Sequence, residues 1–175
     1  MSKIMQIKNL SYRSRCVLLM LSLIIVILDQ VSKFEIRDKF KLYEVKELIQ
    51  NYWNWTLVYN KGAAFSFLAN TSSDLPKIIF GILAVIVAIF LVHYIVSRTY
   101  SMFNGIAIAF ILGGALGNLV DRIIFGYVTD FIQWHYYQHY WPTFNIADSA
   151  ICVGACLLII EGLFFNAKHN DDTKK

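Results

Sequence analysis

Long apolar runs alternate with shorter polar segments along this chain. Four runs of about 20 residues are long enough to cross a hydrocarbon core of about 30 Å. Continuous apolar runs of this length favour helices over the alternating pattern of a membrane barrel. The sequence therefore predicts one integral membrane domain, residues 1–175, an all-α bundle of four transmembrane helices with a small extracytoplasmic β-sheet. The predicted spans are Cys16–Phe34, Ile78–Val96, Met102–Val120 and Ile146–Phe165.

Composition agrees with a membrane protein. Of the 175 residues, 57% are hydrophobic and only 16% are charged, whereas a soluble domain has about 45–50% apolar and about 25% charged residues. The first apolar run follows basic residues, as in a signal peptide. However, Asp29 and Gln30 follow it where a small-residue cleavage site would be needed, so we expect a retained helix. The three cysteines lie within spans, which argues against a disulfide framework.

Basic residues indicate the orientation. Four basic residues and no acidic one precede or open the first span, Arg98 lies between the second and third spans, and three lysines lie in the C-terminal tail. The positive-inside rule makes this face cytoplasmic, a bias that rests mostly on the N-terminal tail. Both termini are then cytoplasmic, and two outer loops remain, at about residues 35–77 and 121–145.

The first outer loop has the periodicity of a strand. Large apolar residues alternate with smaller ones over Trp53–Asn60, Asn60-Lys61-Gly62 has turn chemistry, and Phe65-Ser66-Phe67 resumes the pattern. These residues predict the β-sheet, lying on the membrane surface. Its aromatic residues suit the interfacial belt, and its strands could also hold an extended peptide by β-augmentation. The sequence leaves both roles open.

Polar residues gather at the outer ends of two spans. Gly113 and Gly117 form the small-x-x-x-small pattern that lets helix backbones approach closely. Just beyond them, Asn118, Asp121 and Arg122 share one helical face, where Asp121 and Arg122 could form a structural ion pair. In the first span, Asp29 and Lys33 are spaced i,i+4. They could be an ordinary surface pair, or the lysine could face lipid headgroups.

Asp130 and Asp148 are the strongest candidates for chemistry. Asn145-Ile146-Ala147-Asp148 reads as a helix start, with Asn145 as N-cap and Asp148 favoured by the helix dipole. Asp130 alone could be a loop acid in water. Both nevertheless lie at the same outer membrane edge, where a carboxylate is costly to keep and commonly marks a functional site.

Two adjacent carboxylates would share a proton. At about 4 Å and an effective dielectric of about 20, their charges repel by roughly 4 kcal/mol, on the order of 3 pKa units. One would be ionised and the other protonated near neutral pH. This is the arrangement of an aspartic protease, which activates a water molecule without a metal or a covalent intermediate.

Five segments resemble the lipoprotein signal peptidase family, also called signal peptidase II. The resemblance covers about residues 16–165, and its third and fifth motifs are the most specific. The segments are Asp29-Gln30-x-x-Lys33, Asn60-x-Gly62-x-Ala64-Phe65, Gly113-Gly114-x-x-Gly117-Asn118-x-x-Asp121-Arg122, Val128-x-Asp130-Phe131 and Phe144-Asn145-x-Ala147-Asp148.

The resemblance implies a cofactor-free aspartic endopeptidase of the bacterial inner membrane that works near the outer leaflet. It would remove signal peptides from prolipoproteins just before a diacylglyceryl-modified cysteine. Partners would be the prolipoprotein, membrane phospholipids and globomycin-type inhibitors, with no nucleic acid, no metal and a monomeric state. The dyad would be Asp130 and Asp148, with ancillary roles for Asp29 and Lys33. Substrate positioning or dyad support would fall to Asn60, Gly62, Asn118, Asp121, Arg122 and Asn145.

Other interpretations compete with this one. A metalloprotease could use His135 and His139, which are i,i+4 if helical, although H-E-x-x-H is absent. A serine hydrolase could use Ser149. A proton-coupled transporter would need acids near mid-membrane. The only acid in the inner half of the final span is Glu161, which we expect to snorkel to the cytoplasmic interface.

Overall fold

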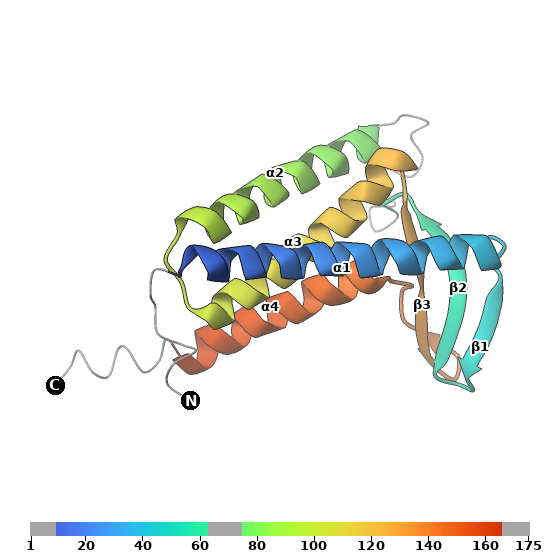
Figure 1. The fold of residues 1–175 in the computed structure, drawn as a ribbon. Coiled ribbons are helices and arrows are strands. Elements are labelled where there is room, and N and C mark those ends of the chain that lie inside the picture. The colour runs from blue at the N-terminus through green and yellow to red at the C-terminus, as the bar shows by residue number, and fades with distance from the viewer. Residues whose placement is uncertain (1–9, 63–74, 166–175) are drawn as a thin grey trace.

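Four antiparallel helices form the body of the protein. The computed structural model describes residues 10–62 and 75–165. The strand predicted at Phe65–Phe67, the motif residues Ala64 and Phe65, and both polar tails lie outside these ranges. All four helices are long and apolar enough to cross a membrane, as predicted, and they run up and down in turn (Figure 1). They are α1 (Tyr12–Lys39), α2 (Leu75–Ser97), α3 (Met102–Ile124) and α4 (Ile146–Phe165).

Two helices continue beyond their apolar spans. Helix α1 begins after the N-cap Ser11, whose Oγ accepts from Ser14 N at 3.2 Å. It continues past its apolar span to Lys39. Polar residues in these last turns bind α3 and the sheet. Helix α3 likewise extends to Ile124, so Asp121 and Arg122 belong to its last turns and not to the outer loop. This corrects the loop boundary predicted at residue 121.

A four-stranded antiparallel sheet lies at one end of the bundle (Figure 1). Strand β2 confirms the strand predicted in the first outer loop. The sheet also draws on the second outer loop, and the interpretation of Asp130 as a loop acid is wrong because it lies in β3 opposite Val58. The strands, in spatial order, are β1 (Val45–Ile49), β2 (Trp53–Asn60), β3 (Val128–Tyr136) and β4 (His139–Tyr140).

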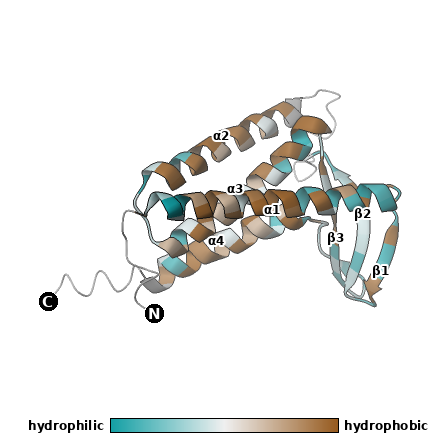
Figure 2. Ribbon diagram, viewed as in Figure 1, coloured by the Kyte–Doolittle hydropathy of each residue, from teal (hydrophilic) through white to brown (hydrophobic). Residues whose placement is uncertain are grey.

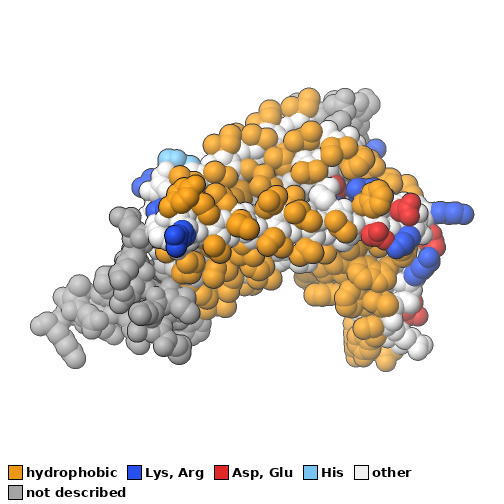
Figure 3. Space-filling model, in the orientation of Figure 1, with side chains coloured by type: hydrophobic (Ala, Val, Ile, Leu, Met, Phe, Trp, Pro, Cys, Tyr) orange, Lys and Arg blue, Asp and Glu red, His pale blue; other side chains and the backbone are white. Residues whose placement is uncertain are grey.

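The helices consist mostly of hydrophobic residues, and hydrophilic residues gather toward their ends and in the sheet (Figure 2). Apolar side chains cover the face of the bundle seen in Figure 3. Helix α3 is the central helix, with 56% of its most apolar window buried, against 17% for α2 and 17% for α4. Exposed apolar surface of this extent suits contact with lipid and not with water. The bundle therefore exposes an apolar surface, as a membrane protein does toward lipid.

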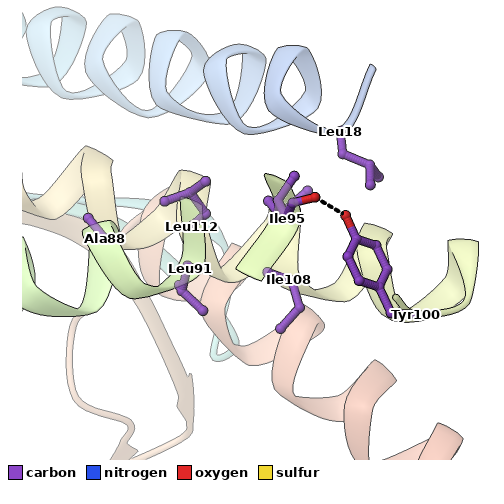
Figure 4. Close-up of a cluster of buried hydrophobic side chains, with 8 residues drawn as sticks. Leu18, Ala88, Leu91, Ile95, Tyr100, Ile108 and Leu112 are labelled. Atoms are coloured by element: carbon purple, nitrogen blue, oxygen red, sulfur yellow. Dashed lines mark hydrogen bonds between the residues drawn. The ribbon is translucent and has the colours of Figure 1, made fainter. Parts of the chain in front are cut away.

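The core is packed between α1, α2 and α3. Tyr100 closes the end of the core that lies away from the sheet, where its Oη donates to the carbonyl oxygen of Ile95 at 2.6 Å (Figure 4). A buried hydroxyl in this position has its hydrogen bond satisfied. The buried residues of this cluster are Leu18, Ala88, Leu91, Ile95, Tyr100, Ile108, Ala109 and Leu112.

Glycines allow α3 to touch both α1 and α4. A Cβ on Gly113 would lie 2.9 Å from the carbonyl oxygen of Ser22 in α1, which confirms the close approach predicted from the glycine pattern. A Cβ on Gly114 would lie 2.3 Å from the carbonyl oxygen of Ala147 in α4. Helix α3 therefore packs directly against the first turn of α4, which carries Asp148.

Candidate active site

Strand pairing brings the start of α4 to Asp130. Phe144 forms a bridge with Ile132 in β3, in which Ile132 N donates to Phe144 O at 2.8 Å and Phe144 N donates to Ile132 O at 3.0 Å. Asn145 follows Phe144 directly and caps α4. The bridge therefore places the cap of α4 beside the strand that carries Asp130.

Asn145 contacts both candidate acids. Its side-chain Nδ2 donates to Asp130 Oδ1 at 2.7 Å, and its backbone N donates to Asp148 Oδ2 at 3.3 Å. In return, Asp148 N donates to Asn145 Oδ1 at 2.9 Å. These two reciprocal bonds form a capping box, which confirms the predicted N-cap. The helix-start interpretation and the paired-acid interpretation are thus compatible, because the cap residue is the one that joins the acids.

Asn60 holds the other oxygen of Asp130. Asn60 Nδ2 donates to Asp130 Oδ2 at 2.9 Å, while Asn60 Oδ1 accepts from Gly62 N at 2.8 Å. Gly62 has φ +93°, and a Cβ there would lie 2.8 Å from the ring of Phe80. Since L side chains rarely adopt this φ, glycine is required for the turn that orients Asn60.

The environment of Asp130 favours its protonated form. Its side chain is 2% exposed. Burial, followed by the negative charge of Asp148, raises the pKa of Asp130 to about 7, although hydrogen bonds from Asn60 and Asn145 oppose the shift. Near neutral pH this carboxyl group therefore exists in both protonation states.

Asp148 is half-buried and is held from α3. Asn118 Nδ2 donates to Asp148 Oδ1 at 2.7 Å. The amide oxygen of Asn118 accepts from Lys33 Nζ at 3.0 Å and from Asn145 Nδ2 at 3.2 Å. With donors on its oxygen, the amide of Asn118 can present only its N–H groups to Asp148.

Asp29 and Lys33 are completely buried, so their interpretation as a surface pair or a headgroup contact is wrong. Lys33 Nζ lies 2.8 Å from Asp29 Oδ2 and 3.4 Å from Asp121 Oδ2, and all three side chains are 0% exposed. Asp29 Oδ1 also accepts from Ala147 N at 2.9 Å, in the first turn of α4. The cluster therefore joins α1, α3 and α4 beneath Asp148.

The interpretation of Asp121 and Arg122 as an ion pair is also wrong. Among the described residues, Asp121 pairs with Lys33 and Arg37, and its Oδ2 accepts from Thr129 N at 2.8 Å. Arg122 Nη1 instead donates to Asn118 O at 3.3 Å. The guanidinium interacts electrostatically with Asp148 and Asp130 as well as with Asp121, so its positive charge acts on the candidate dyad.

Sequence analysis missed two residues that hold β3 in place. Thr129 is completely buried beside Asp130. Arg37 Nη1 donates to Thr129 Oγ1 at 2.9 Å and lies 3.6 Å from Asp121 Oδ1. Arg37 follows Asp29 and Lys33 at intervals of four, which places all three on one helical face. This spacing was the available signal, but the predicted span ended before Arg37.

The residues considered for a metalloprotease, a serine hydrolase or a transporter lie in other surroundings than those functions need or have other hydrogen-bond partners. His135 and His139 lie in β3 and β4 and not on a helix, so their predicted i,i+4 geometry is wrong. Within residues 10–62 and 75–165, no group of three or more His, Cys, Asp or Glu could hold a metal. Ser149 Oγ donates to Asn145 O at 2.9 Å within its own helix. Glu161 accepts from Asn104 Nδ2 at 2.7 Å, in the first turn of α3 and therefore at the end of the bundle away from the sheet.

Comparisons with known proteins agree with one another. Residues 21–164 match the family model described as Signal peptidase (SPase) II. A lipoprotein signal peptidase of Chromobacterium violaceum is 45% identical, covering 82% of this chain and 88% of that protein. One from Pseudomonas putida is 41% identical, covering 88% of this chain and 90% of that protein.

Two solved structures are also similar to this chain. A structure described as a bacterial membrane enzyme has a TM-score of 0.76 and 32% sequence identity, covering 91% of this chain and 99% of that chain. A second, with the same description, has a TM-score of 0.72 and 33% identity, covering 91% of both chains. None of these matches supports the transporter interpretation. The chain therefore belongs to the signal peptidase II family, the lipoprotein signal peptidases, which are aspartic proteases.

Proposed function

We propose that this protein cleaves the signal peptide from diacylglyceryl-modified prolipoproteins, on the N-terminal side of the lipidated cysteine, with Asp130 and Asp148 as its catalytic dyad. The observation that supports the dyad most strongly is the position of Asn145, which donates to Asp130 through its side chain and to Asp148 through its backbone. Two acids held by one residue can act on the same water molecule and the same peptide bond.

The two acids take different roles. Asp148 accepts a proton from water as the water oxygen attacks the scissile carbonyl carbon, and Asp130 gives its proton to the carbonyl oxygen. This step gives a gem-diol intermediate at the scissile carbon, which then breaks down. Asp148 passes its proton to the leaving nitrogen, the C–N bond breaks, and one diol hydroxyl returns a proton to Asp130. The products are a signal peptide with a new carboxylate and a lipidated cysteine with a free amino group.

The pKa of Asp130 supports this assignment. A value of about 7 leaves a proton on Asp130 at neutral pH for much of the time, as the acid role requires. Asp148 is the more exposed of the two acids, which suits a base that must meet water. Arg122, whose charge acts on both acids, is positioned to hold a substrate carbonyl or to stabilise the negative charge that develops on its oxygen.

A lipid-bearing substrate suits the position of the dyad. Strand β3, which carries Asp130, and the start of α4, which carries Asp148, lie where the bundle meets the sheet (Figure 1). Acyl chains of the substrate would stay in the hydrocarbon beside the apolar helices, while the extended peptide crosses between the bundle and the sheet. A globomycin-type cyclic peptide would block the same space. Each protein chain contains both acids and the residues that hold them, so we expect a monomer to be active.

Positive charge at the other end of the bundle supports the orientation that we propose. Arg13, Arg15 and Arg98 lie at the start of α1 and the end of α2, away from the sheet. This end would face the cytoplasm of a bacterial inner membrane. Both termini would then be cytoplasmic, with the dyad near the outer leaflet.

Cleavage of a defined substrate tests this function. The purified protein in detergent should cleave a diacylglyceryl-modified prolipoprotein, and mass spectrometry should find the lipidated cysteine as the new N-terminus. The same prolipoprotein without the lipid is the matched control and should be cleaved far more slowly. EDTA should leave the rate unchanged. Equal cleavage of both substrates, a different N-terminus, or loss of activity in EDTA that zinc restores would contradict the proposal.

A further inference from the structure

A small cavity lies at the end of the bundle opposite the dyad, and the proposed reaction does not use it. Its volume is about 260 Å³, and it is formed by the last turns of α2 and the link to α3. Figure 3 shows basic and histidine side chains grouped over this end of the molecule. The lining residues are Phe90, His93, Tyr94, Arg98 and Thr99.

The cavity is apolar at one end and basic at the other. Arg98 and Thr99 lie just beyond the last residue of α2, whereas Phe90 lies about 10 Å deeper along the helix axis. Phe90 is 61% exposed, on a helix that is largely uncovered by the rest of the protein. A molecule in this cavity would thus meet a cation at the membrane interface and an aromatic ring in the hydrocarbon. Phospholipids have the same order of polar and apolar parts.

Aromatic rings in contact with one another form the back wall of the cavity. The rings of Phe90 and Tyr94 have centroids 6.4 Å apart, and Tyr94 stacks on Tyr100 at 5.3 Å. Tyr100 is buried and donates to Ile95 O (Figure 4). Arg15 lies over the ring of Tyr100 at 5.8 Å. These contacts connect the aromatic wall to the buried Tyr100 and, through Arg15, to α1.

Two basic groups remain available to an anion. Arg15 is already engaged, since its guanidinium donates to Ile95 O at 2.5 Å and to Arg98 O at 3.0 Å. The side chain of Arg98 has no acidic partner within the described parts of the chain. His93 Nδ1 lies 3.4 Å from Ser97 Oγ. In the tautomer in which Ser97 donates to Nδ1, Nε2 carries the ring hydrogen and can donate it to an anion.

We infer that this cavity binds one anionic phospholipid, with its phosphate at Arg98 and His93 and one acyl chain along Tyr94 and Phe90. Basic pockets beside transmembrane helices attract anionic headgroups at the membrane surface. The aromatic back wall adds apolar contact that a free phosphate ion could not use. The lipid would belong to the leaflet opposite the sheet, so it would anchor α2 far from the dyad.

Native mass spectrometry of the purified full chain tests this site. The protein is titrated with phosphatidylglycerol or with phosphatidylcholine of the same acyl chains. One phosphatidylglycerol should bind more tightly than phosphatidylcholine, and Arg98→Gln should weaken its binding about fivefold. Arg13→Gln is the matched control, because Arg13 is an exposed cation at the same end of the bundle outside the cavity. It should change the affinity less than about twofold.

Three results would overturn the inference. Equal weakening by Arg98→Gln and Arg13→Gln would indicate general attraction to a basic surface. Equal affinity for both lipids would remove the role of the anionic headgroup. Displacement of the lipid by soluble glycerol 3-phosphate would show that the acyl chain is not held. The binding measurement needs no proteolysis, so its outcome is independent of the proposed dyad.

Discussion

The side-chain amide of Asn145 donates to Oδ1 of Asp130 across 2.7 Å. Because Asn145 is also the N-cap of α4, one residue both starts the helix and orients the strand acid. Stability and catalysis therefore depend on the same side chain, but they can be separated by experiment.

Asn145→Ala should lower kcat by about 100-fold or more, because the proposed acid loses the group that orients it. It should also destabilise the protein by about 1 kcal/mol through loss of the cap. Cleavage kinetics and thermal unfolding in detergent measure the two effects. Ser11→Ala is the matched control, since it removes the cap of α1 (Ser11 Oγ to Ser14 N, 3.2 Å) at the far end of the bundle. Equal loss of kcat in both variants would mean that Asn145 acts only through stability.

The rate of cleavage should depend on pH through Asp130. The proposed mechanism requires this acid to be protonated, and its pKa is raised to about 7, chiefly by burial. We therefore expect kcat/KM to fall as the pH rises through about 7, with the protein still folded. A pH–rate profile on the lipidated substrate measures this. A constant kcat/KM from pH 6 to pH 9 would contradict the acid role of Asp130.

Stability should depend on pH through the same group. An unfolded Asp has a pKa of about 3.9, so between about pH 4 and pH 7 the folded protein binds a proton that the unfolded chain has released. The contribution of Asp130 to the free energy of unfolding therefore falls as the pH rises through this window. Asp130→Asn removes this dependence. The difference in unfolding temperature, variant minus unmodified protein, should therefore become more positive between pH 4.5 and pH 8. A difference that stays constant with pH would contradict the raised pKa.

Lys33→Met should be strongly destabilising. Lys33 is the cation between two completely buried carboxylates, Asp29 and Asp121. Removing one partner from a buried ionic cluster costs about 3–5 kcal/mol, because the remaining charges lose their compensation. Lys39→Met is the control, since this lysine pairs with Glu35 on the surface of the same helix. Thermal unfolding should show a large shift for Lys33→Met and almost none for Lys39→Met; similar shifts would contradict the account of the cluster.

The sequence was sufficient for the four spans and strand β2, because these depend on apolar run length and strand alternation. Motif spacing singled out the two candidate acids, and their catalytic role stays a prediction. It was insufficient for strand β3, whose pairing with β2 joins residues about 70 positions apart, such as Asn60 and Val128. Hydropathy also marks only the part of a helix that meets lipid. The polar last turns of α1 and α3 were therefore missed, and Arg37 with them.

Burial of the charged cluster could not be predicted either. Asp29 and Lys33 have the spacing of an ordinary surface pair. They are buried because Gly117 lets α3 come so close that an added Cβ would lie 2.7 Å from Asp29 Oδ2. Only the packing of three helices together reveals this contact.

The most direct test of the dyad is the turnover of Asp130→Asn and Asp148→Asn, purified and folded, on a lipid-modified prolipoprotein. Asp38→Asn, an exposed acid at the end of α1, is the matched control. We expect each dyad variant to lose about 100-fold or more in kcat, while Asp38→Asn cleaves at the unmodified rate. Substantial turnover by either folded dyad variant would contradict the central claim that both acids together activate the attacking water.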